Sequence, residues 1–455
     1  MLVQSLSGVR GIYGQTLTPD IASKYAAAYF SVFRPKVIVV GRDTRQSGPA
    51  IKTAMMNTLK CTIIDAGILP TPAIQNAVRH FKADGGIIIT ASHNPAEWNG
   101  FKFLRKDGSV LYEEEMEKVI AKFKKSSSHP PLIPKGTKVI QKRTEAMDVY
   151  REFIFSIIGK KALESIKKQD ISLVIDPNGG AGIIAKEILE SAGIKTIALH
   201  MEIGEFQRQI EPTAESLAYL VPQIRQHKAA FAAGFDCDAD RVEIILSDGR
   251  VLSGNEMIAL SSKHLLASSK APKKEVIVVN NATSSMVREV VEKCGAKIVE
   301  VEVGEANVVQ AMKKLKSKVG GEGSSSGVIL KPATSRDGIL ATLLMAAIVA
   351  QKKKQLAKLL GELPRSCYLK EKIQVESSKV PSLKKAFALH YNAKAIKLSS
   401  KPDGAVKAWI SKRSFVWLRD SKTEDGVVRV IVDAPTLKEA TFLMQEALSV
   451  VKRSQ

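Results

Sequence analysis

The sequence has few cysteines and no long apolar run, and each shortage excludes a class of protein. Its four cysteines, Cys61, Cys237, Cys294 and Cys367, lie far apart without a C-x-x-C pair. That spacing argues against a zinc site or a disulfide scaffold and fits a reducing compartment. The longest apolar stretch, 338–350, is too short to span a bilayer and predicts a buried helix. The N-terminal segment lacks a basic start followed by an apolar run, so we expect a cytoplasmic protein without a signal peptide or a membrane partner.

Acidic residues are scarce relative to basic ones. The chain has 68 Lys and Arg against 46 Asp and Glu, a formal net charge of +22 at pH 7. Such a charge is compatible with nucleic acid, an anionic membrane or anionic small molecules as partners. The lysines lie in short clusters, however, and there is no zinc-finger spacing, aromatic-rich basic strand or long basic arm. We therefore expect a solvated basic surface, compatible with a cleft for phosphorylated ligands, and no nucleic-acid partner.

The pattern of the chain indicates an α/β protein of three or four domains. It has 455 residues, 45% of them hydrophobic and 25% charged, as in ordinary globular proteins. Short β-branched runs alternate with helical patterns over most of the length, whereas the last part places several strands before one long helix. The clearest expected strands are 36–40, 86–90, 171–175, 230–235, 275–279, 297–301, 405–410, 415–418 and 427–432, and the clearest helices are 19–33, 181–192, 285–294 and 437–450.

Changes in composition suggest where the domains end. A stretch rich in Ser, Pro and Lys occupies 124–136, and turn-like segments lie near 247–254 and 361–364. We expect the first three domains to be α/β units and the last to be α+β. The predicted boundaries are 1–145, 146–250, 251–363 and 364–455.

A serine stands directly after one of the expected strands, in the run TASHNP at 90–95. The carboxyl end of an inner strand is the edge at which ligand sites of α/β sheets form. Asn94 and Pro95 favour a turn that holds the hydroxyl of Ser92 outward. A serine needs a neighbouring base or prior phosphorylation for group transfer. Taken alone, the segment leaves open an ordinary turn in which Ser92 is only a cap.

Three aspartates alternate after the strand 230–235. Asp236, Asp238 and Asp240 cannot pack together without a cation, because like charges raise one another's pKa. Alternation in an extended loop directs them to one side, which suits Mg²⁺ completed by phosphate or water oxygens. The spacing is not that of a calcium EF-hand, since Arg241 stands where that loop needs a ligand. The loop predicts a magnesium site, with a solvated acidic turn as the alternative and Cys237 as a passive filler.

Three further turns are weaker candidates. Glu322 lies in the Gly- and Ser-rich run 320–327, which offers a carboxylate and hydroxyls for sugar recognition, with a flexible linker as the alternative. Arg419 begins a turn of hydroxyl and basic residues that suits a phosphate but equally suits a polar surface. The glycine-rich turn 176–182 lacks the G-x-G-x-x-G order and the P-loop lysine, so we expect no nucleotide cofactor.

Taken together, these segments resemble the α-D-phosphohexomutase family, which includes phosphoglucomutase, phosphomannomutase and phosphoglucosamine mutase. The resemblance spans nearly the whole chain and keeps the family's order. It implies three related α/β domains plus a C-terminal α+β domain around a central cleft, each domain supplying one loop to the cleft. The matching segments are SGVRG (7–11), GRDTR (41–45), PTP (70–72), TASHNP (90–95), NGFK (99–102) and DCDADR (236–241).

The resemblance also implies a role for individual residues. Ser92 matches the phosphoserine, and its phosphate completes the shell of one Mg²⁺ per chain held by Asp236, Asp238 and Asp240. Lys102 resembles the general acid/base, a role that it can fill only if a basic cleft lowers its pKa toward neutrality. The other implied site residues are Arg10, His93 and Arg241 around the phosphoryl group, Gly304, Glu322 and Ser324 for the sugar, and Arg419, Ser421, Lys422, Thr423 and Arg429 for the distal phosphate.

The reaction implied by the resemblance converts hexose 6-phosphate to hexose 1-phosphate through a hexose 1,6-bisphosphate, which also serves as activator. We expect glucose or mannose phosphates as substrates. Glucosamine phosphate is the alternative, because the sugar loop departs from the sequences typical of either group and Glu305 stands where some mannose/glucose enzymes have histidine. A third hypothesis is a silent paralogue that binds phosphosugars or nucleic acid, which the retained Ser92 and Lys102 disfavour. We expect a monomer or homodimer whose partner is its phosphosugar substrate.

Overall fold

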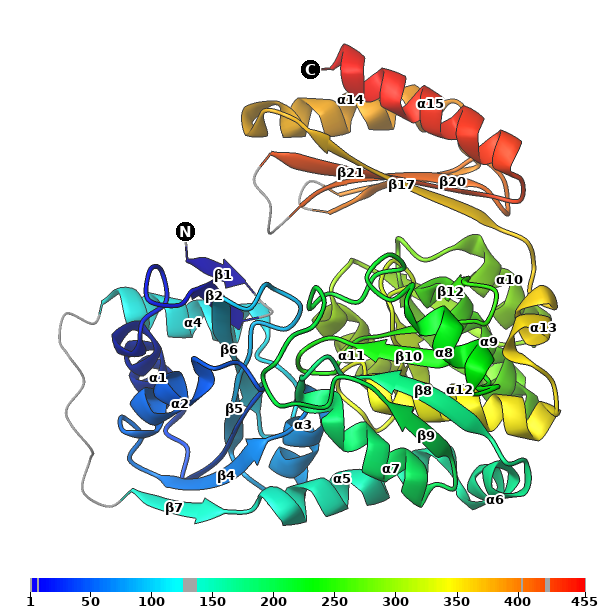
Figure 1. Ribbon diagram of the computed structural model, residues 1–455. Helices are drawn as coiled ribbons and strands as arrows, with labels where there is room; N and C mark the ends of the chain where they lie inside the picture. The colour runs from blue at the N-terminus through cyan, green and yellow to red at the C-terminus, as the bar shows by residue number, and fades with distance from the viewer. Residues whose placement is uncertain (1, 6–7, 126–136, 402–403, 422–425, 455) are drawn as a thin grey trace. The chain divides into compact units, whose positions relative to one another are not determined.

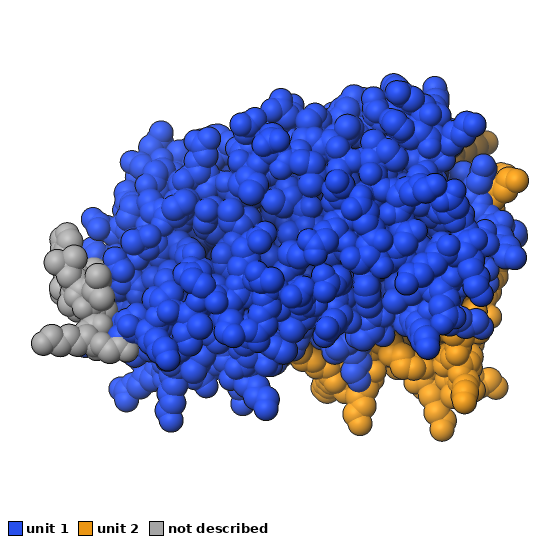
Figure 2. All heavy atoms as spheres, turned by 60° about the horizontal axis from the view of Figure 1, so that its bottom comes forward, with its two compact units in different colours: residues 1–252, 329–357 blue, residues 253–328, 358–455 orange. Residues whose placement is uncertain are grey.

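The computed structural model describes residues 2–5, 8–125, 137–401, 404–421 and 426–454 (Figure 1). Two of the candidate phosphate-site residues, Lys422 and Thr423, lie outside this described part. The chain forms two compact units, 1–252 with 329–357 and 253–328 with 358–455, which Figure 2 colours separately. Among the described residues, no helix is long and apolar enough to cross a membrane.

The first sheet of unit 1 has seven strands in the order β1-β2-β6-β5-β3-β4-β7. Strands β3, β4, β5 and β7 are parallel, and β1, β2 and β6 pair antiparallel. Helices α1, α2 and α4 pack together on one face, and α3 packs with α5 on the other (Figure 1). The elements are β1 (Val3–Ser5), β2 (Gly8–Ile12), α1 (Pro19–Phe33), β3 (Val37–Arg42), α2 (Gly48–Met56), β4 (Thr62–Ile68), α3 (Thr71–His80), β5 (Gly85–Ile89), β6 (Trp98–Arg105), α4 (Glu113–Lys124), β7 (Lys138–Gln141) and α5 (Arg143–Ile158).

The second sheet of unit 1 has the order β12-β11-β10-β8-β9. Strand β10 pairs parallel with β8 on one side and antiparallel with β11 on the other. The loop between β10 and β11 is therefore a hairpin connection. The predicted helix 181–192 is a 3₁₀ turn followed by a short α-helix. The elements are α6 (Lys160–Lys168), β8 (Ser172–Asp176), η1 (Ala181–Ile184), α7 (Ala185–Ser191), β9 (Lys195–Ala198), α8 (Leu220–Gln226), β10 (Ala232–Phe235), β11 (Val242–Ile245) and β12 (Val251–Leu252).

A later segment completes unit 1 with β16 (Ile329–Leu330) and α12 (Gly338–Lys352). The helix is apolar on all sides and nearly all its residues are buried, which confirms the predicted buried helix. Asp337 caps it, because its carboxylate accepts a hydrogen bond from the N–H of Leu340 at 2.9 Å. The N–H of Gly338 donates to the carbonyl of Ala239 at 3.1 Å, so the helix begins against the aspartate loop.

Unit 2 contains a parallel sheet followed by an antiparallel one. The parallel strands pair in the order β14-β13-β15, and the antiparallel sheet has the order β17-β21-β20-β19-β18. Helices α14 and α15 cover one face of the latter (Figure 1). The elements are α9 (Gly254–Ala267), η2 (Pro272–Lys274), β13 (Val276–Asn280), α10 (Ser285–Lys293), β14 (Lys297–Val301), α11 (Glu305–Leu315), β15 (Val319–Gly321), α13 (Leu356–Gly361), β17 (Cys367–Gln374), η3 (Ser377–Lys379), α14 (Val380–Asn392), β18 (Lys397–Ser400), β19 (Val406–Trp409), β20 (Phe415–Asp420), β21 (Val427–Ala434) and α15 (Leu437–Arg453).

The two sheets of unit 2 meet at a buried aromatic cluster formed around Trp409, Phe415 and Trp417. The indole N–H of Trp417 donates to Asn281 Oδ1 at 3.1 Å, next to the end of β13. The antiparallel sheet is therefore fixed to the parallel one by specific polar contacts as well as by apolar packing. The predicted fold class, three α/β sheets followed by a C-terminal α+β part, is confirmed.

Candidate active site

Ser92 lies just beyond β5, at the carboxyl edge of the first sheet. The side chain is buried, and the backbone is left-handed, with φ of 52°. Its N–H donates to Thr90 Oγ1 at 2.8 Å, and its hydroxyl donates to Asp236 Oδ2 at 3.0 Å. The structure therefore brings the predicted serine next to the first of the predicted aspartates, although the two follow strands of different sheets.

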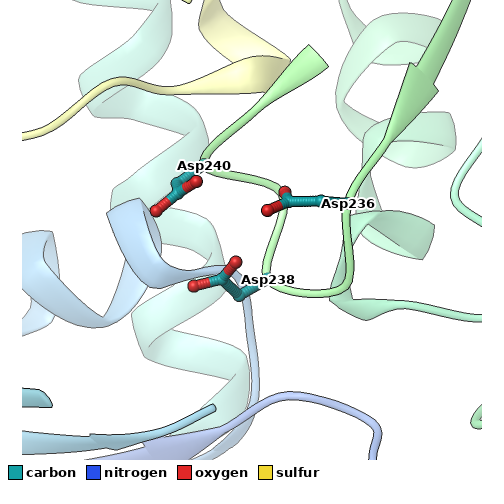
Figure 3. A group of neighbouring side chains, drawn as sticks. All are labelled: Asp236, Asp238 and Asp240. Carbon is teal, nitrogen blue, oxygen red and sulfur yellow. The ribbon is translucent and has the colours of Figure 1, made fainter. Parts of the chain in front are cut away.

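Three carboxyl groups converge in the loop between β10 and β11 (Figure 3). Asp236, Asp238 and Asp240 are buried, and one oxygen of each lies within 4.8 Å of the others. Asp238 Oδ1 and Asp240 Oδ1 are buried with no hydrogen-bond partner among the described residues. Buried anionic oxygens without donors are costly, and hard oxygen ligands in this number suit Mg²⁺. The residues present therefore fit a divalent cation, and the solvated acidic turn that the sequence left open does not describe this loop.

The pKa values of Asp236 and Asp240 are shifted in opposite directions. Burial, followed by the charges of Asp238 and Asp240, raises the pKa of Asp236 well above its ordinary value. Burial also acts to raise the pKa of Asp240, but nearby cations, with Lys102 first and Arg336 next, outweigh it and lower the pKa. A bound cation would relieve the repulsion that disfavours ionised Asp236.

Lys102 projects from β6 into this cluster. Its Nζ donates to Asp238 Oδ2 at 2.9 Å and to Asp240 Oδ2 at 3.1 Å. The lowered pKa that this role requires is not what these contacts produce. Burial does lower the pKa of the ammonium, but the two carboxylates outweigh burial and raise the pKa above its ordinary value. The sequence indicated the positive charge of a cleft and did not indicate that the lysine faces two aspartates.

The other predicted residues of the phosphoryl site gather around the same loops. Arg10 Nη1, on β2, donates to Asn94 Oδ1 at 2.9 Å. Burial, then the charges of Arg241 and Arg10, lower the pKa of His93, which keeps its imidazole neutral. Arg241 Nη1 lies 3.0 Å from Glu211 Oε1. Unit 1 therefore brings together Ser92, the three aspartates, Arg10, His93, Lys102 and Arg241.

Sequence reasoning missed supporting residues of the metal loop. Arg336 is buried and contributes to the lowered pKa of Asp240; the Arg-Asp-Gly run before the apolar helix was its only signal. Arg208 Nη2 donates to the carbonyl of Phe235 at 2.8 Å, while its Nε lies 2.6 Å from Asp176 Oδ2. The turn beginning at Asp176 thus belongs to the support of this loop. Burial raises the pKa of Cys237 well above its ordinary value, as suits the predicted passive filler.

The candidate sugar loop lies in unit 2, at the carboxyl edge of its parallel strands. Glu322 is buried, and its Oε1 accepts hydrogen bonds from Asn280 Nδ2 at 3.1 Å and from the N–H of Gly304 at 2.7 Å. Asn280 Nδ2 also donates to Ser324 Oγ at 3.1 Å. The three predicted residues thus share one network, organised by an asparagine that sequence reasoning missed. A flexible linker does not describe this hydrogen-bonded network around a buried carboxylate.

The candidate phosphate turn connects β20 to β21 in the same unit. Arg419 is buried and pairs in register with Arg429 across the two strands. The N–H of Ser421 donates to the carbonyl of Val427 at 2.7 Å. The structure therefore brings two arginines and one hydroxyl to a single turn.

Comparison with known proteins agrees with this geometry. Family models described as phosphoglucomutase/phosphomannomutase, alpha/beta/alpha domains I, II and III, match residues 2–130, 149–249 and 253–367. A Thermococcus kodakarensis protein named phosphoglucomutase/phosphomannomutase is 30% identical, over 98% of each chain. A Thermococcus gammatolerans protein named probable phosphoglucosamine mutase has the same identity and coverage.

A solved structure supports the fold over the full length. The crystal structure of a phosphoglucomutase/phosphomannomutase family protein from Burkholderia thailandensis aligns with a TM-score of 0.85 at 22% identity, covering 100% of this chain and 98% of that one. The matched family models and the full-length relatives together show that the chain belongs to the phosphoglucomutase/phosphomannomutase family of α-D-phosphohexomutases and is an intramolecular phosphotransferase.

Proposed function

We propose that the enzyme interconverts the 6- and 1-phosphates of glucose or mannose through phosphorylated Ser92 and a hexose 1,6-bisphosphate. One observation carries the proposal: the buried hydroxyl of Ser92 lies 3.0 Å from Asp236, within a cluster of three carboxylates and Lys102. A nucleophilic hydroxyl, a cation site and a proton carrier in one place are what phosphoryl transfer requires.

Asp236, Asp238 and Asp240 would hold the Mg²⁺ ion, one per chain. Two of their buried oxygens have no donor among the described residues and would be satisfied by it. Mg²⁺ held by these carboxylates would neutralise charge on the transferring phosphoryl group and orient it. The remaining charge would be neutralised by the side chains of Arg10 and Arg241.

The transfer conserves atoms and protons. The bond between phosphorus and Ser92 Oγ breaks while a bond forms from phosphorus to the free hydroxyl of the hexose monophosphate, which loses its proton. Because Asp238 and Asp240 hold Lys102 protonated, the lysine is set to return a proton to the serine oxygen. The neutral amine left after that donation, once released from the two carboxylates, accepts the proton of the attacking hydroxyl, so Lys102 ends the transfer protonated.

The second transfer reverses the first with the sugar turned round. After the bisphosphate exchanges its two ends, Ser92 Oγ takes the other phosphoryl group and releases the product. We assign sugar recognition to Gly304, Glu322 and Ser324, whose shared network supports that role. The distal phosphate is assigned to Arg419, Ser421, Lys422, Thr423 and Arg429.

Glucosamine phosphate is the second candidate substrate, because the named relatives divide between phosphoglucomutase/phosphomannomutase and phosphoglucosamine mutase at about the same identity. The test is a panel of glucose, mannose and glucosamine phosphates, assayed with and without Mg²⁺ and the matching bisphosphate. We expect Mg²⁺-dependent turnover of at least one of these sugar phosphates. Ser92→Ala should lower that turnover by at least about 100-fold. Near-normal activity of the alanine variant, or no activity on any of the sugars, would contradict the proposal.

A further inference from the structure

Arg45 is a fully buried arginine of unit 1. It stands shortly after β3 as the last residue of the segment GRDTR (41–45), and the resemblance implied no role for it. An arginine has five N–H donors, and here every one has an acceptor. Nε donates to Asp43 Oδ2 (3.2 Å), Nη1 to the carbonyls of Pro95 (2.5 Å) and Trp98 (3.0 Å), and Nη2 to the carbonyls of Ser92 (2.9 Å) and Asn94 (2.5 Å).

Four of these five acceptors are main-chain carbonyls of one segment, 92–98, which we name the serine loop. The charge of a buried guanidinium is usually paired with carboxylates. Here a single carboxylate is present, and the serine loop supplies the other four hydrogen-bond acceptors. The planar fork spreads its donors in fixed directions, so it joins the two ends of the serine loop to one rigid group. The loop has no helix or strand of its own over 92–97 to hold its shape.

Asp43 fixes the guanidinium to the sheet. The Oδ1 of Asp43 accepts a hydrogen bond from the backbone N–H of Arg45 at 3.0 Å. The backbone N–H of Asp43 donates to the carbonyl of Ile89, the last residue of β5, at 3.0 Å. Both side chains of the pair are fully buried. The carboxylate therefore orients Arg45 relative to the strand from which the serine loop emerges.

Ser92 needs such support because its backbone is unfavourable. A left-handed φ of 52° is disfavoured for a residue with a side chain. A residue keeps such a backbone conformation only where contacts from the surrounding structure hold it there. The carbonyl of Ser92 is bound by Arg45, and its N–H by Thr90. These two contacts fix both peptide planes and direct the hydroxyl to Asp236.

We propose that Arg45, oriented by Asp43, is a positioning residue that holds the serine loop so that Ser92 Oγ stays aligned for phosphoryl transfer. Arg45 touches neither the reacting oxygen nor the substrate, in contrast to the role proposed for Arg10. The inference rests on the proposed function, since alignment of Ser92 matters only if Ser92 carries the phosphoryl group. Lysine cannot replace the arginine, because three donors on one nitrogen do not reach acceptors spread along the loop.

The test compares Arg45→Lys with Arg79→Lys in the full chain. Arg79 is a partly buried arginine of unit 1 that donates to Thr334 Oγ1 at 3.0 Å and Asn76 Oδ1 at 3.2 Å, away from the serine loop. We expect R45K to lower kcat about 100-fold, the scale of a misplacement near 1 Å, with KM within about threefold. The rate at which glucose 1,6-bisphosphate phosphorylates Ser92, followed by mass spectrometry, should fall in parallel. R79K should change neither quantity.

A folded R45K enzyme with normal kcat, or an equal loss in R79K, would overturn the inference. If R45K does not fold, Asp43→Asn decides, because asparagine keeps an acceptor for the Arg45 backbone N–H but replaces the oxygen that accepts from Nε with an amide donor. We expect about a tenfold lower kcat at unchanged KM, and normal kcat in D43N would overturn the inference. A wild type that is inactive and carries no phosphate on Ser92 would instead refute the proposed function, and this inference with it. An active, phosphorylated wild type whose R45K variant is equally active refutes this inference alone.

Discussion

The buried lysine of the C-terminal sheet gives a prediction with a definite sign. Lys407 on β19 is 1% exposed, and its Nζ lies 3.1 Å from Glu300 Oε2 and 4.0 Å from the ring centroid of Phe415. Burial lowers the pKa of Lys407 to about 8, against the opposing effect of Glu300. The neighbouring strand β20 ends in the candidate phosphate turn, so the packing of this lysine bears on the position of Arg419.

The lowered pKa predicts how stability depends on pH. Between pH 8 and the ordinary value of 10.5 the unfolded lysine binds a proton and the folded one does not. Stability therefore rises with pH through this window, and below pH 8 the full cost of the buried charge is present. A difference of about 2.5 in pKa corresponds to about 3 kcal/mol. Lys407→Met removes the titration, and Glu300 keeps its ion pair with Arg288 at 2.6 Å.

The assay is urea unfolding of wild type and K407M at a series of pH values, followed by tryptophan fluorescence. Trp409 and Trp417 lie in the same aromatic cluster, so the signal reports mainly on this region. We expect the stability of wild type relative to K407M to rise by about 3 kcal/mol as pH increases from below 8 to above 10.5. Titration of the other lysines cancels in the difference. A difference that stays constant, or that falls as pH rises, would refute the reasoning.

Three further predictions concern the sites. Lys102→Met should bind Mg²⁺ at least about tenfold more tightly by calorimetry while losing turnover, because the ammonium neutralises Asp238 and Asp240; weaker binding would count against the metal site. Gly338→Ala should weaken Mg²⁺ binding, since its Cβ would lie 2.8 Å from the carbonyl oxygen of Arg241, whereas Gly361→Ala meets nothing within 4 Å and should change nothing. Asn280→Asp should raise KM about tenfold with little change in kcat, because it places a carboxylate against Glu322; an unchanged KM would argue against sugar binding there.

The pattern of apolar residues along the chain was sufficient to predict the helices and strands whose side chains are mostly buried. The apolar helix α12 and the strands β5, β10 and β13 follow from runs of buried side chains. Strands β17 and β18 went unpredicted because none of their residues is buried, so neither contains the continuous apolar run that marks the central strands. The helix predicted at 181–192 begins as a 3₁₀ turn, a difference that hydrophobic spacing does not reveal.

The site was predictable as a set of loops and not as a set of contacts. Ser92 and Asp236 each follow a buried strand, but those strands belong to different sheets, and only the resemblance to a family suggested that they meet. The raised pKa of Lys102 depends on which side chains face it. Arg45 binds main-chain carbonyls, which every residue possesses, so no sequence pattern marks its partners.

The most direct measurement follows one phosphate in a single turnover. The chain is phosphorylated with bisphosphate, freed of excess ligand, and mixed with a limiting amount of hexose 6-phosphate in the presence of Mg²⁺. Mass spectrometry then measures phosphate on the peptide that contains Ser92, and chromatography measures the bisphosphate. Phosphate should leave Ser92 and appear as hexose 1,6-bisphosphate at the same rate. Because the second transfer rephosphorylates Ser92, the bisphosphate used to load the enzyme is isotopically labelled. Label that stays on the serine while sugar is converted, or that sits on another residue, would contradict the assignment of Ser92 as the phosphoryl carrier.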